Sequence, residues 1–287
     1  MSSTEFTVAV PGGVIAGVRS GRGFPLLVLH GGPGVSDYTG LLAGELADWT
    51  ALRYTQRGVA PSTASGPFTI DQHVADAIAV LDQHNVSSAA VLGHSWGGYL
   101  AMQLAAAAPE RVAGLVLVDS LGGAGDGGFA AFGAGTDARV GPEVLAEVAA
   151  LDEVAEASPG TPEADAAGVK SFDLMWPGYF ADPPSAPPPP AGIRVSPDCY
   201  TGTFESIQAA QADGRLANQL ARYCGPVEIV AGAASPFPIE TATSTAALFS
   251  DARVSVVPGA GHLPWHERPG CVTAALRRLA DRLSTVS

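Results

Sequence analysis

Short apolar runs alternate with amphipathic stretches along residues 1–121 and 223–287. The runs have the length of buried strands, whereas the amphipathic stretches repeat apolar residues at helical spacing. This alternation is typical of a mainly parallel sheet with helices on both faces. We predict two strands within residues 5–18 around a turn at 11–13, six more at 25–29, 51–55, 89–92, 114–118, 227–230 and 254–257, and helices near 38–46, at 70–83 with Thr69 as N-cap, and at 96–108, 239–249 and 272–283.

The intervening residues 122–222 break this rhythm. They begin with a glycine-rich stretch, continue with an acidic helical segment at 142–157, and contain a proline-rich run at 183–190. We expect this run to form an extended, polyproline-like strut. Aromatic residues just before the prolines favour a packed cap inserted after the sixth strand over a disordered linker. The domain prediction is therefore a core of residues 1–121 and 223–287 with a cap of residues 122–222.

The composition narrows the function classes. The 287 residues include 15 Lys and Arg against 28 Asp and Glu, a net charge of −13, so a basic surface for nucleic acid is not expected. No apolar run is long enough to span a membrane, and the first ten residues do not resemble a secretory signal. Three cysteines without CxxC spacing favour a reduced, cytoplasmic protein with no disulfide framework and no structural zinc.

The strongest chemical signal is the sequence GHSWG at residues 93–97. It follows a predicted strand and precedes a predicted helix, the context in which a G-x-S-x-G motif holds a nucleophilic serine on a sharp turn. The turn needs small residues on either side of the serine, and Gly93 and Gly97 meet that need. Ser95 is the candidate nucleophile.

A serine nucleophile needs a base, and His262 is the candidate among six histidines. It lies on a glycine-containing loop after the last predicted strand, and such loops meet at one edge of an α/β sheet. The other histidines have structural interpretations. We expect His73 and His84 to be solvated, His30 and His94 to make structural hydrogen bonds, and His266 to begin the last helix.

A tetrahedral intermediate also needs two backbone N–H donors. One comes from the residue after the nucleophile, which is Trp96. We assign the second to Gly32 in the early loop HGGPG at residues 30–34.

Together, HGGPG at 30–34, YTQRG at 54–58, GHSWGG at 93–98 and the late Gly261-His262 resemble the α/β-hydrolase fold, in its proline iminopeptidase-like group of serine hydrolases. The resemblance covers residues 1–121 and 223–287. It implies an α/β-hydrolase fold with an eight-stranded sheet and an inserted helical cap. It also implies Ser95 as nucleophile, His262 as base, and Gly32 and Trp96 as oxyanion donors.

Two positions depart from this group. The acid that orients the histidine usually stands in a G-x-x-D-P pattern after the next-to-last strand, but residues 232–236 are GAASP, with Ser235 in its place. Asp119, at the end of the preceding strand, is the favoured replacement; Glu240 or no acid at all are the alternatives. Thr55 replaces an Asp before Gln-Arg-Gly, which we expect to change a hydrogen bond near Arg57.

We therefore predict a serine hydrolase that cleaves a small ester or amide through an acyl-enzyme, like an esterase or aminopeptidase, with no metal or organic cofactor implied. Cap aromatic residues either bind the substrate or form the cap core: Phe172, Trp176, Tyr179 and Phe180. The cap glutamates stand in no motif that would hold a substrate amine. A non-hydrolytic cyclase or lyase and a non-catalytic binding protein remain alternatives. The natural substrate and the oligomeric state stay open.

Overall fold

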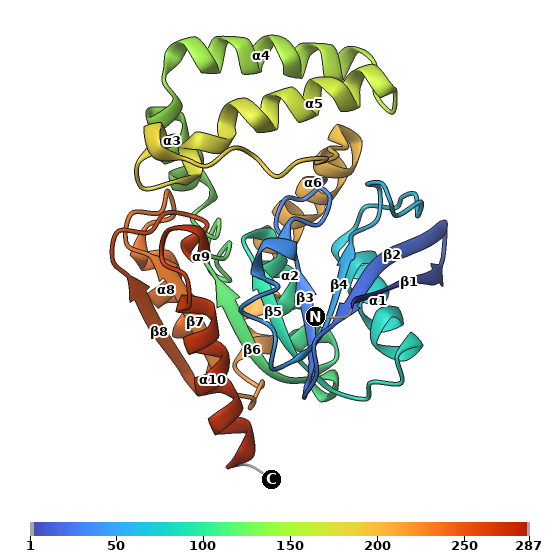
Figure 1. Cartoon of the computed structure of the whole chain (residues 1–287), viewed down its shortest axis with the longest axis vertical. Coiled ribbons are helices and arrows are strands. Elements are labelled where there is room, and N and C mark those ends of the chain that lie inside the picture. Colours follow the sequence, from blue (N-terminus) through green and yellow to red (C-terminus); the bar gives the residue numbers. More distant parts are fainter. Residues whose placement is uncertain (1–2, 286–287) are drawn as a thin grey trace.

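An eight-stranded sheet forms the centre of the protein (Figure 1). The computed structural model describes residues 3–285. In spatial order the strands are β1 (Ser3–Val10), β2 (Gly13–Ser20), β4 (Thr50–Thr55), β3 (Pro25–Leu29), β5 (Ala89–His94), β6 (Val112–Val118), β7 (Val227–Gly232) and β8 (Ala252–Val257). The β1–β2 and β2–β4 pairs are antiparallel and all the others are parallel. The predicted mainly parallel, eight-stranded sheet is confirmed.

Helices cover both faces of this sheet. Alternate residues of the central strands pack on opposite sides, for example Leu27 in one core cluster and Val28 in the other. Both faces of the sheet are therefore buried, which explains why β3, β5 and β6 are continuous apolar runs in the sequence. The flanking elements are α1 (Ile70–Gln83), α2 (Trp96–Ala107), α8 (Ile239–Ala246), α9 (Pro264–Glu267), α10 (Cys271–Ser284) and the 3₁₀ turns η1 (Thr39–Leu42) and η2 (Pro109–Arg111). The predicted N-cap of α1 forms, since Thr69 accepts a hydrogen bond from the Gln72 amide.

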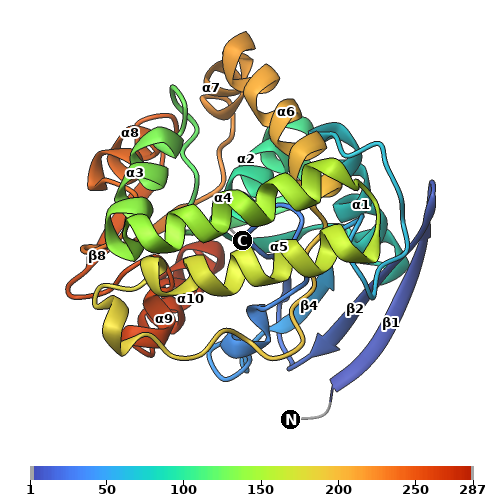
Figure 2. The same ribbon diagram turned by 90° about the horizontal axis from the view of Figure 1, so that it is seen from above.

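Between β6 and β7 the chain forms the expected helical insertion. Its elements are α3 (Phe129–Val140), α4 (Pro142–Ala157), α5 (Pro162–Met175), η3 (Trp176–Tyr179), η4 (Pro183–Ser185), α6 (Pro197–Asp213) and α7 (Arg215–Leu220). Helices α4 and α5 lie side by side across one end of the sheet (Figures 1 and 2). In contrast, Leu216 and Leu220 of α7 join the same core cluster as the sheet residues.

Three local predictions differ from the structure. The helical spacing near residues 38–46 yields only the single turn η1, because Gly40 and Gly44 weaken a helix there. The proline run begins with the turn η4 and then continues without regular structure, where the Pro187 carbonyl accepts a hydrogen bond from Trp176 Nε1 at 2.8 Å. His266 lies in the separate short helix α9, before the last helix.

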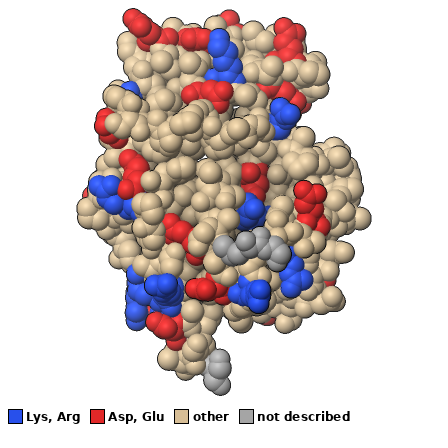
Figure 3. Space-filling model, in the orientation of Figure 1, with Lys and Arg blue, Asp and Glu red and all other residues tan. Residues whose placement is uncertain are grey.

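Charged side chains are spread over the face drawn in Figure 3, where Lys and Arg lie among Asp and Glu and form no continuous stripe. The three cysteines are free thiols. Within residues 3–285 no helix is both long and apolar enough to cross a membrane, and no cluster of side chains has the make-up of a metal site.

Candidate active site

Ser95 occupies a strained turn between β5 and α2. Its backbone has a φ of 55° and a ψ of −124°, a conformation that L-residues rarely adopt. A Cβ on Gly93 would lie 2.2 Å from the Gly97 carbonyl oxygen, and one on Gly97 would lie 2.1 Å from the Leu29 carbonyl oxygen. Both positions therefore require glycine. The turn leaves Ser95 at the start of α2, where the helix dipole favours a developing negative charge.

His262 and Asp119 are in direct contact. The loop after β8 carries His262, and Asp119 follows β6; His262 Nδ1 lies 2.6 Å from Asp119 Oδ2. The two side chains are buried, with residue exposures of 4% and 3%. Glu240, the alternative acid, is exposed in the first turn of α8.

The Asp119 carboxylate accepts two further hydrogen bonds from the loop after β7. The Gly232 amide donates to Oδ1 at 3.0 Å, and the Ser235 hydroxyl donates to Oδ2 at 2.5 Å. Each carboxylate oxygen is thus held, and the plane of the group is fixed relative to the imidazole.

Burial sets the protonation of this pair. It lowers the pKa of His262 well below the usual value for histidine, since Phe132, Phe237 and Tyr179 surround the ring at centroid distances of 4.7, 5.5 and 5.6 Å. Burial also raises the pKa of Asp119 to about 7, against the opposing effect of its hydrogen-bond donors. At neutral pH His262 is therefore neutral. With Nδ1–H directed at Asp119, its Nε2 carries a free lone pair.

Ser95, His262 and Gly32 line one cavity of about 750 Å³ beneath the α4–α5 pair. Of the four cap aromatic residues predicted to face substrate, Phe172, Trp176 and Tyr179 line this cavity. Phe180 does not. Its side chain is 1% exposed and packs against Trp176 and His266, so the expectation that it contacts substrate is corrected.

Gly32 of the HGGPG loop lines the cavity. Gly32 has a φ of +123°, and its N–H has no acceptor among the residues that the structure describes. Trp96 is the first residue of α2, so its N–H has no partner within the helix. These two donors remain the candidates for an oxyanion hole.

A hydrogen-bonded chain holds the HGGPG loop; it runs through His94, which the sequence predicts as a structural hydrogen-bonding residue, and through Tyr38, which the sequence does not single out. His94 Nε2 lies 2.8 Å from the His262 carbonyl oxygen, which can only accept, so Nε2 carries the proton. Burial keeps the pKa of His94 well below its usual value, so its Nδ1 is an acceptor for the Tyr38 hydroxyl at 2.6 Å. Tyr38 in turn accepts from the Gly31 amide at 3.0 Å. The chain ties the HGGPG loop to the loop that carries His262.

Replacing Tyr38 with phenylalanine should lower kcat by about 10- to 100-fold, because the loop then loses its fixed distance from Ser95. Steady-state kinetics on an activated ester measures this effect. Tyr54→Phe is the matched control, since the buried Tyr54 hydroxyl has no hydrogen-bond partner within residues 3–285. Equal losses in the two variants would contradict a positioning role for Tyr38.

Gln56 links the same loop to the nucleophile turn. Its side-chain Nε2 donates to the His30 carbonyl at 2.9 Å, and its Oε1 accepts from Trp96 Nε1 at 2.7 Å. The Gln56 amide donates to His30 Nε2 at 3.0 Å, so His30 is the structural hydrogen-bonding residue that the sequence predicted.

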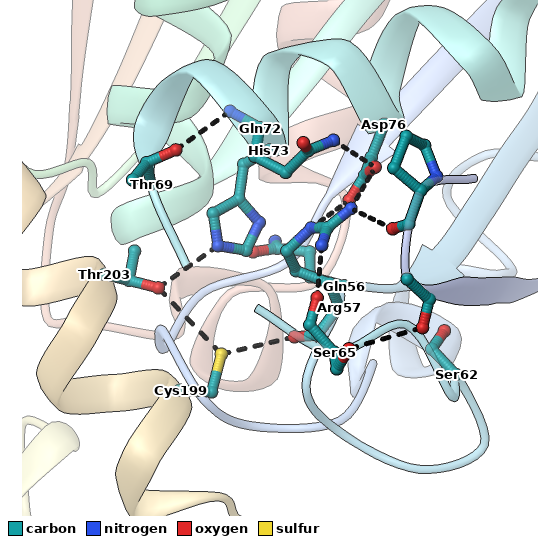
Figure 4. Close-up of polar contacts among 12 residues, drawn as sticks. Gln56, Arg57, Ser62, Ser65, Thr69, Gln72, His73, Asp76, Cys199 and Thr203 are labelled. Atoms are coloured by element: carbon teal, nitrogen blue, oxygen red, sulfur yellow. Dashed lines mark hydrogen bonds and ion pairs between the residues drawn. The ribbon is translucent and has the colours of Figure 1, made fainter. Parts of the chain in front are cut away.

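Around Gln56 and Arg57, Figure 4 shows a polar network. Arg57 forms a bidentate ion pair with Asp76 of α1, with both N–O distances at 2.7 Å. His73 is 1% exposed and lies 3.1 Å from Thr203 Oγ1 of α6, so the prediction of a solvated His73 was wrong. The error arises because α6 covers this face of α1, which the pattern of α1 alone does not show.

Comparison with known proteins agrees with this architecture. Residues 25–144 match the model of the family described as alpha/beta hydrolase fold. The solved 2-hydroxy-6-oxo-6-phenylhexa-2,4-dienoate hydrolase from Rhodococcus sp. strain RHA1 superposes with a TM-score of 0.69 at 20% identity, covering 98% of this chain and 100% of that one. The chain has the α/β-hydrolase fold.

Curated relatives align over part of this α/β-hydrolase-fold chain. A 2-hydroxymuconate semialdehyde hydrolase from Pseudomonas sp. (strain CF600) is 37% identical over 38% of this chain. A proline iminopeptidase from Heyndrickxia coagulans is 32% identical over 39% of it. The alignments span 42% of each relative's own length. The resemblance noted from the motifs is thus confirmed, with proline iminopeptidases as one group of relatives among several.

Thr55, the second departure from the proline iminopeptidase-like pattern, makes a hydrogen bond with the segment before η1. Its Oγ1 accepts a hydrogen bond from the Asp37 amide at 3.2 Å, whereas the carboxylate partner of Arg57 is Asp76. Thr55 therefore takes no part in the ion pair between Arg57 and Asp76.

Proposed function

We propose that this protein is a serine hydrolase that cleaves small esters or amides through an acyl-enzyme on Ser95. The observation that carries the proposal is the 2.6 Å contact between His262 and Asp119, with His262 lining the same cavity as Ser95. A serine, a neutral imidazole and a carboxylate that orients it are the groups that acyl transfer to water requires.

In the proposed reaction, His262 Nε2 removes the Ser95 proton as Oγ attacks the carbonyl carbon of the substrate. The Gly32 and Trp96 amides stabilise the oxyanion. His262 then gives the proton to the leaving alcohol or amine, and the tetrahedral intermediate collapses to the acyl-enzyme. Water attacks next, with His262 as base, and releases the acid and free Ser95.

The charges around the cavity favour a neutral or cationic substrate. Four carboxylate residues line it, and none of its described lining residues is Lys or Arg: the four are Asp152, Glu156, Asp198 and Glu205. Acidic side chains also lie along the top of the molecule in Figure 3, where α4 lies. A cleft with one sign of charge repels ligands of that sign.

We expect p-nitrophenyl butyrate to be hydrolysed with a kcat/KM about tenfold above that of the anionic p-nitrophenyl hemisuccinate, a substrate of similar size. Added salt should lower the ratio of the two kcat/KM values toward one, because it screens the carboxylates. Asp152→Asn combined with Glu156→Gln should narrow it too. A preference for the anion would contradict this substrate class, and no turnover of either ester would contradict ester hydrolysis.

A further inference from the structure

We infer that Ser235 is a positioning residue for Asp119: its hydroxyl holds the carboxylate toward His262 and stabilises its ionised form. This role rests on the proposed function, in which Asp119 orients the base. It gives a purpose to the serine that stands where the proline iminopeptidase-like group carries its acid.

The backbone fixes where the Ser235 hydroxyl lies. The turn after β7 is held by hydrogen bonds from the Ser235 amide to the Gly232 carbonyl at 3.1 Å and from the Ala234 amide to the Ala260 carbonyl at 2.8 Å. The second bond joins the turn to the loop that carries His262. The turn that carries Ser235 is therefore held against the loop that carries His262.

The direction of the Ser235 hydroxyl hydrogen is determined as well. Ser235 Oγ accepts from the Phe237 amide at 3.0 Å, so its own hydrogen is free to donate to Asp119 Oδ2 at 2.5 Å. That same oxygen accepts from His262 Nδ1. A hydroxyl and an imidazole thus share one carboxylate oxygen, and charge-assisted bonds of this kind are the strong ones.

The burial of Asp119 and its few charged neighbours make the hydrogen bond from Ser235 important for the charge of Asp119. Asp119 is almost fully buried, and the titratable and charged groups that face it are His262, His94 of β5 and Arg139 of α3. Arg139 donates its hydrogen bonds to backbone carbonyls, including that of Ala234 at 2.6 Å. Burial raises the pKa of Asp119. Among the groups that lower this pKa, the hydrogen bond from Ser235 has the largest effect. Without that bond the pKa of Asp119 would be higher, so the carboxyl group would stay protonated up to a higher pH.

Protonation of the pair stops the base. A proton on His262 leaves Nε2 occupied. A proton on Asp119 would be donated to Nδ1, and the imidazole would then carry its hydrogen on Nε2. In both arrangements Nε2 cannot accept the Ser95 proton, so activity falls as pH drops through the pKa of the pair.

An aspartate at position 235 would not substitute for this serine while Asp119 is present. Ser235 Oγ lies 2.5 Å from Asp119 Oδ2, and two carboxylates that close would not both ionise and would share a proton. With the acid at position 119, position 235 therefore suits a neutral hydroxyl and not a second carboxylate.

The test is the pH dependence of kcat/KM on p-nitrophenyl butyrate. Ser235→Ala should move the acid limb to higher pH by about one unit. Ser235→Cys, with a weaker donor of similar shape, should move it less in the same direction, and Ser235→Thr should restore it. Ser120→Ala is the matched control, because the Ser120 hydroxyl, next to Asp119 in the chain, donates to the Leu121 carbonyl. An unmoved limb in folded Ser235→Ala and Ser235→Cys would overturn the proposal.

A second readout separates this proposal from the proposed function. The carboxyl ¹³C resonance of Asp119, followed against pH by NMR, needs no turnover. Its titration should move upward in Ser235→Ala even if the protein hydrolyses none of the esters. No change in that titration would overturn the role of Ser235, whereas absent turnover alone would count only against ester hydrolysis.

Discussion

Ser95→Ala is expected to lower kcat for p-nitrophenyl butyrate by about 10⁵- to 10⁶-fold. The substitution removes the only atom that forms the acyl bond in the proposed reaction. The oxyanion donors and cavity walls stay in place, so the residual rate should reflect binding and oxyanion stabilisation alone. The alanine side chain is smaller than that of serine and introduces no clash in the turn at residue 95. We therefore expect the variant to fold like the native protein.

Single-turnover and steady-state assays on purified Ser95→Ala protein measure this loss. Ser120→Ala serves as the control, because it removes a nearby hydroxyl that lies outside the proposed machinery. A Ser95→Ala protein that keeps more than about a hundredth of the native kcat would show that another group performs the chemistry, since a lost nucleophile costs far more.

Asp119→Asn is the second large effect, with an expected loss of about 10³- to 10⁴-fold in kcat. The Gly232 amide donates to Oδ1, so the asparagine carbonyl will take that place. Its amide nitrogen then faces His262 Nδ1 and donates to it. The imidazole is forced to carry its hydrogen on Nε2, the tautomer that cannot act as base.

Glu240→Gln is the matched control for Asp119→Asn. Glu240 lies exposed on α8, so its kinetics should equal those of the native protein. The reverse pattern, with activity lost in Glu240→Gln and kept in Asp119→Asn, would remove Asp119 from the account.

The sheet and the nucleophile turn were predictable because their signals are local. Strands such as β3 and β5 are buried on both faces and are therefore unbroken apolar runs. Ser95 is flanked by glycines that sterics demand at that turn. His262 could be placed because loops at one sheet edge converge.

The partners of these residues were harder to predict, since they meet across the fold. Asp119 could be favoured from its place at a strand end, but its 2.6 Å contact with His262 spans 143 residues of sequence. The sequence places Tyr38 only in the predicted helix near residues 38–46, because its partner His94 lies 56 residues away. His73 was misplaced for the same reason: the covering helix α6 comes from the insertion.

The most direct test of the account is labelling with a fluorophosphonate probe, followed by mass spectrometry of the digested protein. The account predicts one covalent adduct, on the peptide that contains Ser95, which is absent in Ser95→Ala. It also predicts much slower labelling in Asp119→Asn, where His262 cannot activate the serine. A native protein that hydrolyses esters but carries no adduct on Ser95 would contradict the central claim.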